Sequence, residues 1–170
     1  MAVKSNISSD IITRQFVLNE NTPTVISDAY KKIRTNILSS MHERGFNCIA
    51  VSSQCKNEGK STTSANLAIT MSMLGKRILL VDCDPQGNAS SGMGVSKSTR
   101  PNTYDMLING TAAADCVVHT QYGDVIPTGK ELAAASVELI GSEKREYVLK
   151  NALNTLTNKY DYILIDCPPS

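Results

Sequence analysis

The order of segments between residues 48 and 81 constrains this chain more than any other part of its sequence. An apolar run at 48–51 is followed by polar residues at 52–59, a helix-like stretch at 60–74 and a second apolar run at 77–81. Short apolar runs separated by a helix are typical of buried parallel strands. The segment therefore predicts a βαβ unit with a right-handed crossover, in an α/β domain with a mainly parallel sheet.

Gly59, Lys60 and Ser61 stand where the first strand of this unit gives way to its helix. Residues 54–61 match the P-loop pattern G-x-x-x-x-G-K-[ST], except that Gln54 occupies the first glycine position. Glycine lets the backbone approach a phosphate, the N–H groups at a helix start favour an anion, and the lysine and hydroxyl serve the phosphates and magnesium. Gly-Lys-Ser also occurs by chance, but its place between strand and helix favours nucleotide binding. The residues expected to bind the nucleotide are Lys56, Asn57, Glu58, Gly59, Lys60, Ser61 and Thr62.

Three aspartates follow the predicted strands. Asp82 and Asp84 stand at the carboxyl end of the second strand, and Asp166 ends the apolar run 162–165. Ligands of open α/β sheets bind at the carboxyl ends of strands. Isolated aspartates at strand ends are more often turn formers or helix caps, but three of them around a P-loop favour a functional site.

Length and composition exclude several classes of protein. A chain of 170 residues suggests one domain, and its net charge of +1 gives no overall attraction to nucleic acid or anionic membranes. The apolar runs are too short to span a bilayer, and the first ten residues lack the regions of a secretory signal. Five cysteines without C-x-x-C spacing indicate reduced, mostly buried thiols. We therefore expect a cytoplasmic protein.

The rest of the chain is divided as follows. We expect a flexible extension at 1–26, an N-terminal helix at 27–45 capped by Ser27, and a P-loop ATPase domain at 46–170. Within that domain the pattern predicts a loop with short turns at 85–99, helices at 103–109, 130–139 and 142–158, and strands at 124–127 and 160–166. The chain stops directly after a strand expected to be central, where a doubly wound sheet normally continues. The predicted fold is a three-layer P-loop NTPase fold, apparently truncated at the C-terminus.

Two segments resemble the ParA/Soj family of chromosome- and plasmid-partitioning ATPases. They are residues 76–88, Lys-Arg-Ile-Leu-Leu-Val-Asp-Cys-Asp-Pro-Gln-Gly-Asn, and residues 160–170, Tyr-Asp-Tyr-Ile-Leu-Ile-Asp-Cys-Pro-Pro-Ser. The resemblance covers about residues 47–170. It implies an Mg-dependent ATPase in which Lys60 and Asp84 are catalytic, Asp84 acting on the attacking water. Magnesium would be bound by Ser61, Asp82 and Asp166. It further implies an ATP-driven homodimer, non-specific DNA binding and a ParB-like partner that stimulates hydrolysis.

The chain departs from that family at the phosphate loop. The family carries a signature lysine five residues before the lysine of the Gly-Lys pair, and here Cys55 holds that position. Our hypothesis is that Lys56 serves one position late and reaches the phosphates of a partner subunit. The family's C-terminal third, which completes the sheet, is also missing from this sequence.

A second resemblance lies at the front of the chain. Residues 27–37 and 58–63 are similar to bacterial tyrosine kinases of the capsule and exopolysaccharide type, whose N-terminal helix mediates ring assembly. Asp28, Lys31 and Arg34 reproduce the spacing of one acid and two bases in that helix. The alternative is an amphipathic helix whose charged face is solvated. A tyrosine autokinase is therefore the alternative function, and a nucleotide-binding regulator without turnover is a third.

Overall fold

The apolar runs of the sequence form one five-stranded sheet in the computed structural model, which describes residues 17–141 and 143–169. The strands are β1 (Cys48–Val51), β2 (Ile78–Asp82), β3 (Val118–Thr120), β4 (Gly123–Ile126) and β5 (Tyr162–Asp166). Their order is β1-β5-β2-β4-β3, and every neighbouring pair is parallel except β3 with β4. The predicted α/β class with a mainly parallel sheet is confirmed.

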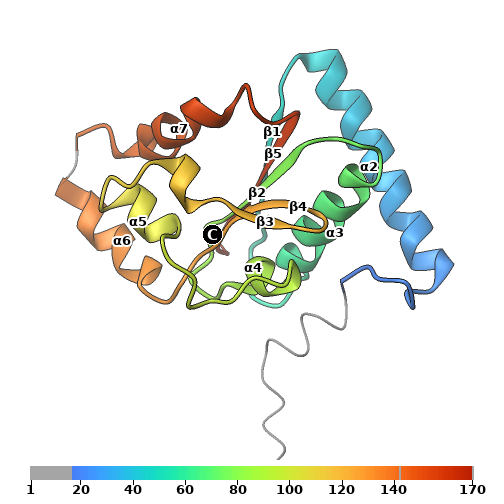
Figure 1. The fold of residues 1–170 in the computed structure, drawn as a ribbon, viewed down its shortest axis with the longest axis horizontal. Coiled ribbons are helices and arrows are strands. Elements are labelled where there is room, and N and C mark those ends of the chain that lie inside the picture. Colours follow the sequence, from blue (N-terminus) through green and yellow to red (C-terminus); the bar gives the residue numbers. More distant parts are fainter. Residues whose placement is uncertain (1–16, 142, 170) are drawn as a thin grey trace, which may run out of the picture.

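Helices cover both faces of this sheet, which gives the three predicted layers (Figure 1). The α-helices are α2 (Thr24–Arg44), α3 (Lys60–Ser72), α4 (Asn88–Gly92), α5 (Thr103–Leu107), α6 (Leu132–Glu138) and α7 (Val148–Leu153). Short 3-10 turns are η1 (Ala113–Cys116), η2 (Leu139–Gly141), η3 (Arg145–Tyr147) and η4 (Asn154–Leu156). Side chains alternate along β2, so Ile78 and Leu80 pack in the core beneath α3, whereas Leu79 and Val81 pack in the core with Met106 of α5.

The predicted βαβ unit is built from β1, α3 and β2, but its two strands are not neighbours. β5 lies between them and pairs in parallel with both, so that Asp166 is in register with Val51 on one side and with Asp82 on the other. The local pattern of strand, helix and strand could not predict that β5 lies between the two strands, because β5 comes from a distant part of the sequence.

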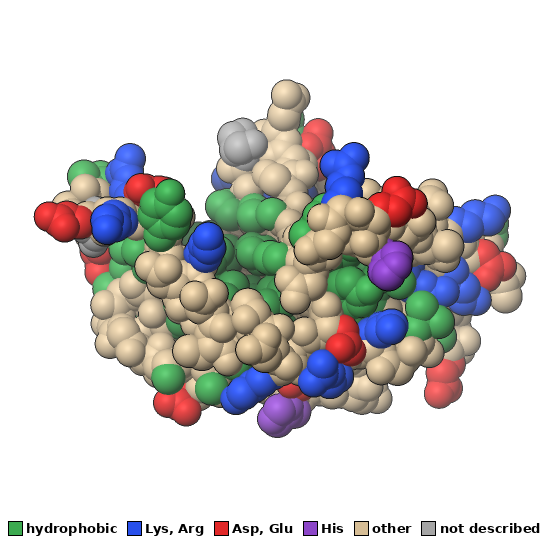
Figure 2. All heavy atoms as spheres, turned by 90° about the horizontal axis from the view of Figure 1, so that it is seen from above, with side chains coloured by type: hydrophobic (Ala, Val, Ile, Leu, Met, Phe, Trp, Pro, Cys, Tyr) green, Lys and Arg blue, Asp and Glu red, His purple; other side chains and the backbone are tan. Residues whose placement is uncertain are grey.

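β1 has the predicted bounds but not the predicted burial. Cys48 and Ala50 are exposed, whereas Ile49 packs against the core with α3. Among the described residues β1 pairs only with β5 and forms an edge of the sheet. From above, hydrophobic side chains are in view in a hollow between two raised regions of the molecule (Figure 2). All five cysteines are free thiols, but only Cys116 is fully buried, so the expectation of mostly buried thiols was wrong for Cys48 and Cys55.

The N-terminal helix is longer than predicted. It begins at Thr24 after Pro23, not at Asp28 after Ser27, and it ends at Gly45 as expected, in the left-handed conformation that glycine adopts without strain. Just before it, Val17 and Leu18 are buried in the core with α3, while residues 1–16 of the predicted extension lie outside the described residues.

The second half of the sequence holds two further differences. The helix predicted at 142–158 is reduced to α7 flanked by the 3-10 turns η3 and η4. The antiparallel strand β3 was not predicted, because three residues are too few to show a period.

Candidate functional site

The start of α3 has the backbone form of an anion site. Gly59 precedes the helix with a φ of 84°, a left-handed conformation that a residue with a Cβ adopts only with strain. The first intrahelical hydrogen bond of the segment is donated by Thr63 N–H to the Gly59 carbonyl at 2.8 Å. The N–H groups before Thr63 therefore remain available at the positive end of the helix dipole.

Three contacts between buried side chains connect this helix to the strand ends. Lys60 Nζ lies 3.5 Å from Asp84 Oδ2, and both side chains are more than nine-tenths buried. Ser61 Oγ donates to Asp166 Oδ2 at 2.7 Å, and Ser64 Oγ donates to Asp166 Oδ1 at 2.8 Å. The fold thus brings together four of the predicted site residues, Lys60, Ser61, Asp84 and Asp166, from three separate segments.

Asp82 lies beside this group but is held by a different set of donors. Its Oδ2 accepts from both the backbone N–H and the Oγ of Ser90 at 2.7 Å, and its Oδ1 accepts from the Asp84 N–H at 3.1 Å. Complete burial, and then the nearby charge of Asp166, raise the pKa of Asp82 to about 7. The contacts of Asp82 in this structure are therefore structural, and its role as a magnesium ligand stays a prediction.

The front of the phosphate loop is open to solvent. Lys56, Asn57 and Glu58 are all exposed, and Asn57 has a φ of 65°, which asparagine tolerates better than most residues. The Glu58 carboxylate accepts from the Cys55 N–H at 3.1 Å and so closes the turn on itself. Thr62 is half-buried on the first turn of α3. These residues are placed where a nucleotide could contact them, but their role stays a prediction.

The oxygen donors at this site suit magnesium better than a softer metal. Within residues 17–141 and 143–169, no three His, Cys, Asp or Glu side chains come together in a way that could hold a metal ion by themselves. Magnesium fits such a site, because it is bound through one or two carboxylates together with phosphates and water. Ser61 and Asp166 supply a hydroxyl and a carboxylate side by side.

Several residues that support the site were missed by sequence reasoning. Ser64, Ser90 and Thr103 are fully buried hydroxyl residues, and Thr103 Oγ1 lies 2.8 Å from the Asp82 carbonyl and 3.0 Å from the Pro127 carbonyl. Ser64 could have been found, because it lies one helical turn after Lys60 and so shares its face. Ser90 and Thr103 carry no such local signal, since their partners lie on other elements.

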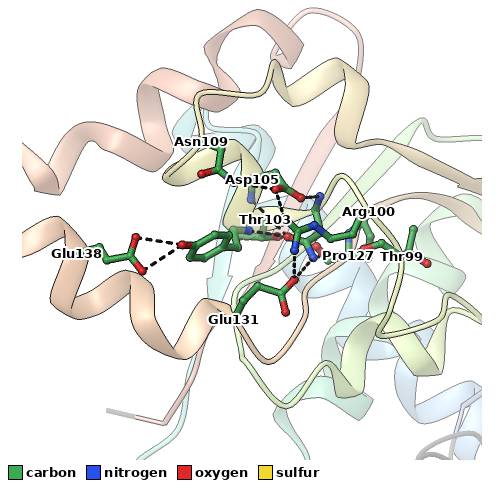
Figure 3. A network of polar contacts seen from close by, with 10 residues as sticks. Thr99, Arg100, Thr103, Asp105, Asn109, Pro127, Glu131 and Glu138 are labelled. Carbon is green, nitrogen blue, oxygen red and sulfur yellow. Dashed lines mark hydrogen bonds and ion pairs between the residues drawn. The ribbon is translucent and has the colours of Figure 1, made fainter.

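A polar network behind α5 fixes the loop that leads to Thr103 (Figure 3). The Arg100 guanidinium pairs with Asp105 and, at 3.0 Å, with Glu131. Asn102 caps α5 by accepting from the Tyr104 and Asp105 N–H groups, and its own Nδ2 donates to Glu131 at 2.7 Å. Thr103, the first residue of α5, bonds to the Asp82 and Pro127 carbonyls, so this end of the helix lies at the carboxyl ends of β2 and β4.

A glycine turn before a helix, a lysine and serine at that helix start, and carboxylates at the ends of two parallel strands define a P-loop NTPase fold. The chain belongs to the AAA domain family, whose match covers residues 46–170. The sporulation initiation inhibitor protein Soj of Bacillus subtilis is 46% identical over 125 residues, which are 72% of this chain and 49% of Soj. The chromosome partitioning protein ParA of Myxococcus xanthus is 42% identical over 135 residues, 75% of this chain and 48% of that protein. The chain therefore spans about half the length of the curated relatives it matches, and the predicted ParA/Soj resemblance is confirmed.

Solved structures agree with this assignment. Cobyrinic acid a,c-diamide synthase from Mycobacterium smegmatis, with bound ATP analog and magnesium, is 34% identical with a TM-score of 0.70 and covers 73% of this chain and 52% of its own. A plasmid partition protein from Borrelia burgdorferi is 30% identical with a TM-score of 0.63, covering 73% and 57%. Binding of nucleotide and magnesium therefore occurs in this fold.

The BceF tyrosine kinase domain matches a longer part of the chain. It is 26% identical with a TM-score of 0.70 and covers 85% of this chain and 56% of its own. Residues 46–170 are less than three quarters of the 170 residues, so this match extends into the part that precedes residue 46. The second predicted resemblance, to bacterial tyrosine kinases, is thereby supported as a structural likeness.

Proposed function

We propose that this chain binds ATP with magnesium and hydrolyses it. The observation that carries the proposal is the buried group of Lys60, Ser61, Asp84 and Asp166 at the start of α3 and the ends of β2 and β5. The α3 N–H groups and Lys60 would hold the phosphates, and Ser61 with Asp166 would hold magnesium, which neutralises charge on the transferred phosphoryl group.

Asp84 is the residue placed to act on water in this proposal. Its Oδ2 lies beside the ammonium group of Lys60, and its Oδ1 accepts a hydrogen bond from the Gln86 N–H at 3.0 Å. These two contacts fix the direction of the carboxylate. Phosphates that attract Lys60 would leave Asp84 free to accept a proton from, or to orient, an attacking water. Loss of Asp84 would then reduce ATP hydrolysis more than it reduces ATP binding.

The wider role that we propose is that of a ParA/Soj-type switch in chromosome or plasmid partitioning. In this role, ATP drives a homodimer in the cytoplasm that binds DNA non-specifically and responds to a ParB-like partner. The similarity of the chain to the sporulation initiation inhibitor protein Soj and to the chromosome partitioning protein ParA supports this role. No helix in the described part of the chain is both long and apolar enough to cross a bilayer.

A tyrosine autokinase is the second candidate, and helix α2 favours it. The likeness to the BceF kinase domain extends into the residues before 46, and α2 packs on the phosphate-loop helix through Arg34, whose Nη1 donates to the Thr70 carbonyl at 2.7 Å. Lys31 pairs with Asp28 at 2.9 Å on the exposed side of the same helix. A regulator that binds nucleotide without turnover is the third candidate.

One experiment separates the three candidates. The protein is incubated with Mg-ATP while phosphate release, anti-phosphotyrosine signal and DNA gel shift are followed together, with the Lys60→Ala variant as the inactive reference. We expect phosphate release and a DNA shift, and we expect Lys60→Ala to lose nucleotide binding, whereas Lys130→Ala, at an exposed lysine, keeps it. A phosphotyrosine signal without a DNA gel shift would contradict the partition role. Retained nucleotide binding without a phosphotyrosine signal or a DNA gel shift would favour the regulator.

A further inference from the structure

A cavity of about 510 Å³ lies at the opposite end of β2 from the nucleotide site. Its wall includes Ile78, the first residue of β2, whereas Asp82 is the last residue of that strand. At about 3.3 Å per residue, the two ends are roughly 13 Å apart. The volume is within the range of small-molecule sites. The cavity is separate from the phosphate loop.

The floor of the cavity is apolar. Ile78 and Leu156 are buried, and Val117 is half-buried. The three residues come from different parts of the chain: Ile78 begins β2, Leu156 ends the turn η4, and Val117 directly follows η1. An apolar body of a ligand could displace water from this floor and gain free energy by burial.

The rim carries basic side chains whose charge is incompletely compensated. Lys76 and Lys159 line the cavity, and neither forms an ion pair or a side-chain hydrogen bond with any residue in the described ranges. The pKa of Asp161 is lowered chiefly by its hydrogen bonds from Arg77, and the charge of Lys76 adds to this effect. Arg77, also in the wall, pairs with Asp161 at 2.8 Å. The rim therefore keeps two ammonium groups that can meet an anion.

The single acid in the wall is already engaged by its neighbours. Asp124 Oδ2 accepts from the Tyr160 hydroxyl at 2.6 Å, and Asp124 Oδ1 lies 2.7 Å from His119 Nδ1. Burial, and then this hydrogen bond to Asp124, raise the pKa of Tyr160, so its hydroxyl stays a donor. Both oxygens of the Asp124 carboxylate are therefore engaged within the wall, which reduces their repulsion of a bound anion.

We propose that this cavity is a second ligand site, which binds a small organic anion with an apolar body. The phosphate or carboxylate group of the ligand lies between Lys76 and Lys159, and its apolar body lies on Ile78, Val117 and Leu156. Two ammonium groups favour the anion through charge-assisted hydrogen bonds, and the floor selects against an inorganic anion that has nothing to bury.

The test uses three probes that separate the two halves of the site. Phenyl phosphate carries both an anion and a ring, inorganic phosphate carries the anion alone, and benzyl alcohol carries the ring alone. Each is titrated into the isotope-labelled 170-residue protein, and binding is followed through backbone amide shifts. We expect phenyl phosphate to bind at least about tenfold more tightly than either other probe, with shifts centred on residues 76–78, 117–119 and 156–160. Shifts at residues 59–62 report the phosphate loop and are scored separately.

Variants then assign the contacts. Lys76→Ala combined with Lys159→Ala should weaken phenyl phosphate at the cavity by about tenfold or more, whereas Lys130→Ala should leave it unchanged. Ala114→Trp places a large side chain at an exposed wall position and should block the cavity without disturbing the core. Unchanged affinity in the double lysine variant, equal affinity for inorganic phosphate, or shifts confined to residues 59–62 would each overturn the proposal.

Discussion

At the scale of single residues, the contact between Lys60 and Asp84 explains how a lysine and an aspartate can both be buried at this site. They lie 3.5 Å apart with little exposure to water, and each compensates the charge of the other. The contact also links binding to chemistry, because a phosphate must compete with Asp84 for Lys60. Substitution of Lys60 and substitution of Asp84 should therefore abolish different steps, nucleotide binding in the first case and hydrolysis in the second.

Asp84→Ala should retain nucleotide binding and lose hydrolysis. Removing the carboxylate leaves Lys60 free for phosphate, but it takes away the group that acts on water, so turnover should fall by about a hundredfold or more. Nucleotide titration and phosphate release measure the two effects, with the exposed Asp115→Ala as the control. Turnover at the wild-type rate would remove Asp84 from the catalytic role.

Asp82 gives the protein a predictable dependence on pH. Its folded-state pKa of about 7 is above its ordinary value, so between about pH 4 and 7 the folded state holds a proton that the unfolded state has released. The contribution of Asp82 to stability is therefore present at low pH and is lost as the pH rises through this window.

The Asp82→Asn variant tests this dependence. In magnesium-free buffer from about pH 5 to 8, the melting temperature of the variant should improve relative to wild type as the pH rises, because asparagine has no proton to release. Asp115→Asn serves as the matched exposed control. A difference between Asp82→Asn and wild type that is constant with pH would contradict the assignment.

At the scale of elements, helix α2 is anchored by few residues for its length. Met41 is the one fully buried hydrophobic side chain of α2, whereas Val25, near the start of the helix, is 74% exposed. The other contacts with the core come from partly buried side chains, including Tyr30, Ile37 and Leu38. The anchoring of this helix is therefore strongest in its C-terminal half, where Ile37, Leu38 and Met41 lie.

Met41→Ala should destabilise the protein by about 2–5 kcal/mol, because it leaves a cavity beneath the end of α2. Val25→Ala should change stability by less than about 0.5 kcal/mol, since its side chain is already in water. Urea unfolding with a common slope for wild type and both variants measures the two effects. Equal effects of the two substitutions would show that α2 is not anchored as described.

Element boundaries were predictable where a local signal exists. Gly45 ends α2 and Gly59 precedes α3 because both positions require left-handed backbone, which the sequence marks with glycine. The start of α2 was misplaced, because Ser27 is a good capping residue while the chain instead begins the helix after Pro23 without a side-chain cap. Ser27 lies inside α2, so its preference for the capping position did not decide where the helix begins.

At the scale of the whole molecule, the exposed turn at 54–58 is the part of the phosphate loop that could meet a second subunit. Lys56 lies there with its side chain exposed, one position after the cysteine that replaces the family's signature lysine. If Lys56 reaches the phosphates of a partner, Lys56→Ala should weaken ATP-dependent dimerisation and turnover together while ATP still binds the monomer.

Sedimentation with and without Mg-ATP, together with phosphate release, measures this effect. Lys130→Ala is a matched control, since Lys130 is also exposed in a loop. We expect the dimer to be lost in the Lys56 variant alone. Dimerisation and turnover untouched by Lys56→Ala would end the hypothesis that this lysine replaces the signature lysine.

The chemical groups of the site, and the elements that carry them, could be predicted from the sequence alone. Gly59, Lys60 and Ser61 lie between β1 and α3, and Asp84 and Asp166 follow β2 and end β5, as the apolar runs indicated. These features were predictable because backbone conformation and hydrophobic period depend on residues that are near one another in the chain.

How these groups come together depends on the arrangement of the whole fold. Ser61 and Asp166 are 105 residues apart in sequence, and they come within 2.7 Å because β5 lies between β1 and β2. The same insertion leaves β1 at an edge of the described sheet and brings Asp82 beside Asp166, while α4 supplies Ser90 to hold it. Strand order and buried hydrogen bonds depend on burial and pairing across the whole fold, and no local pattern of residues records them.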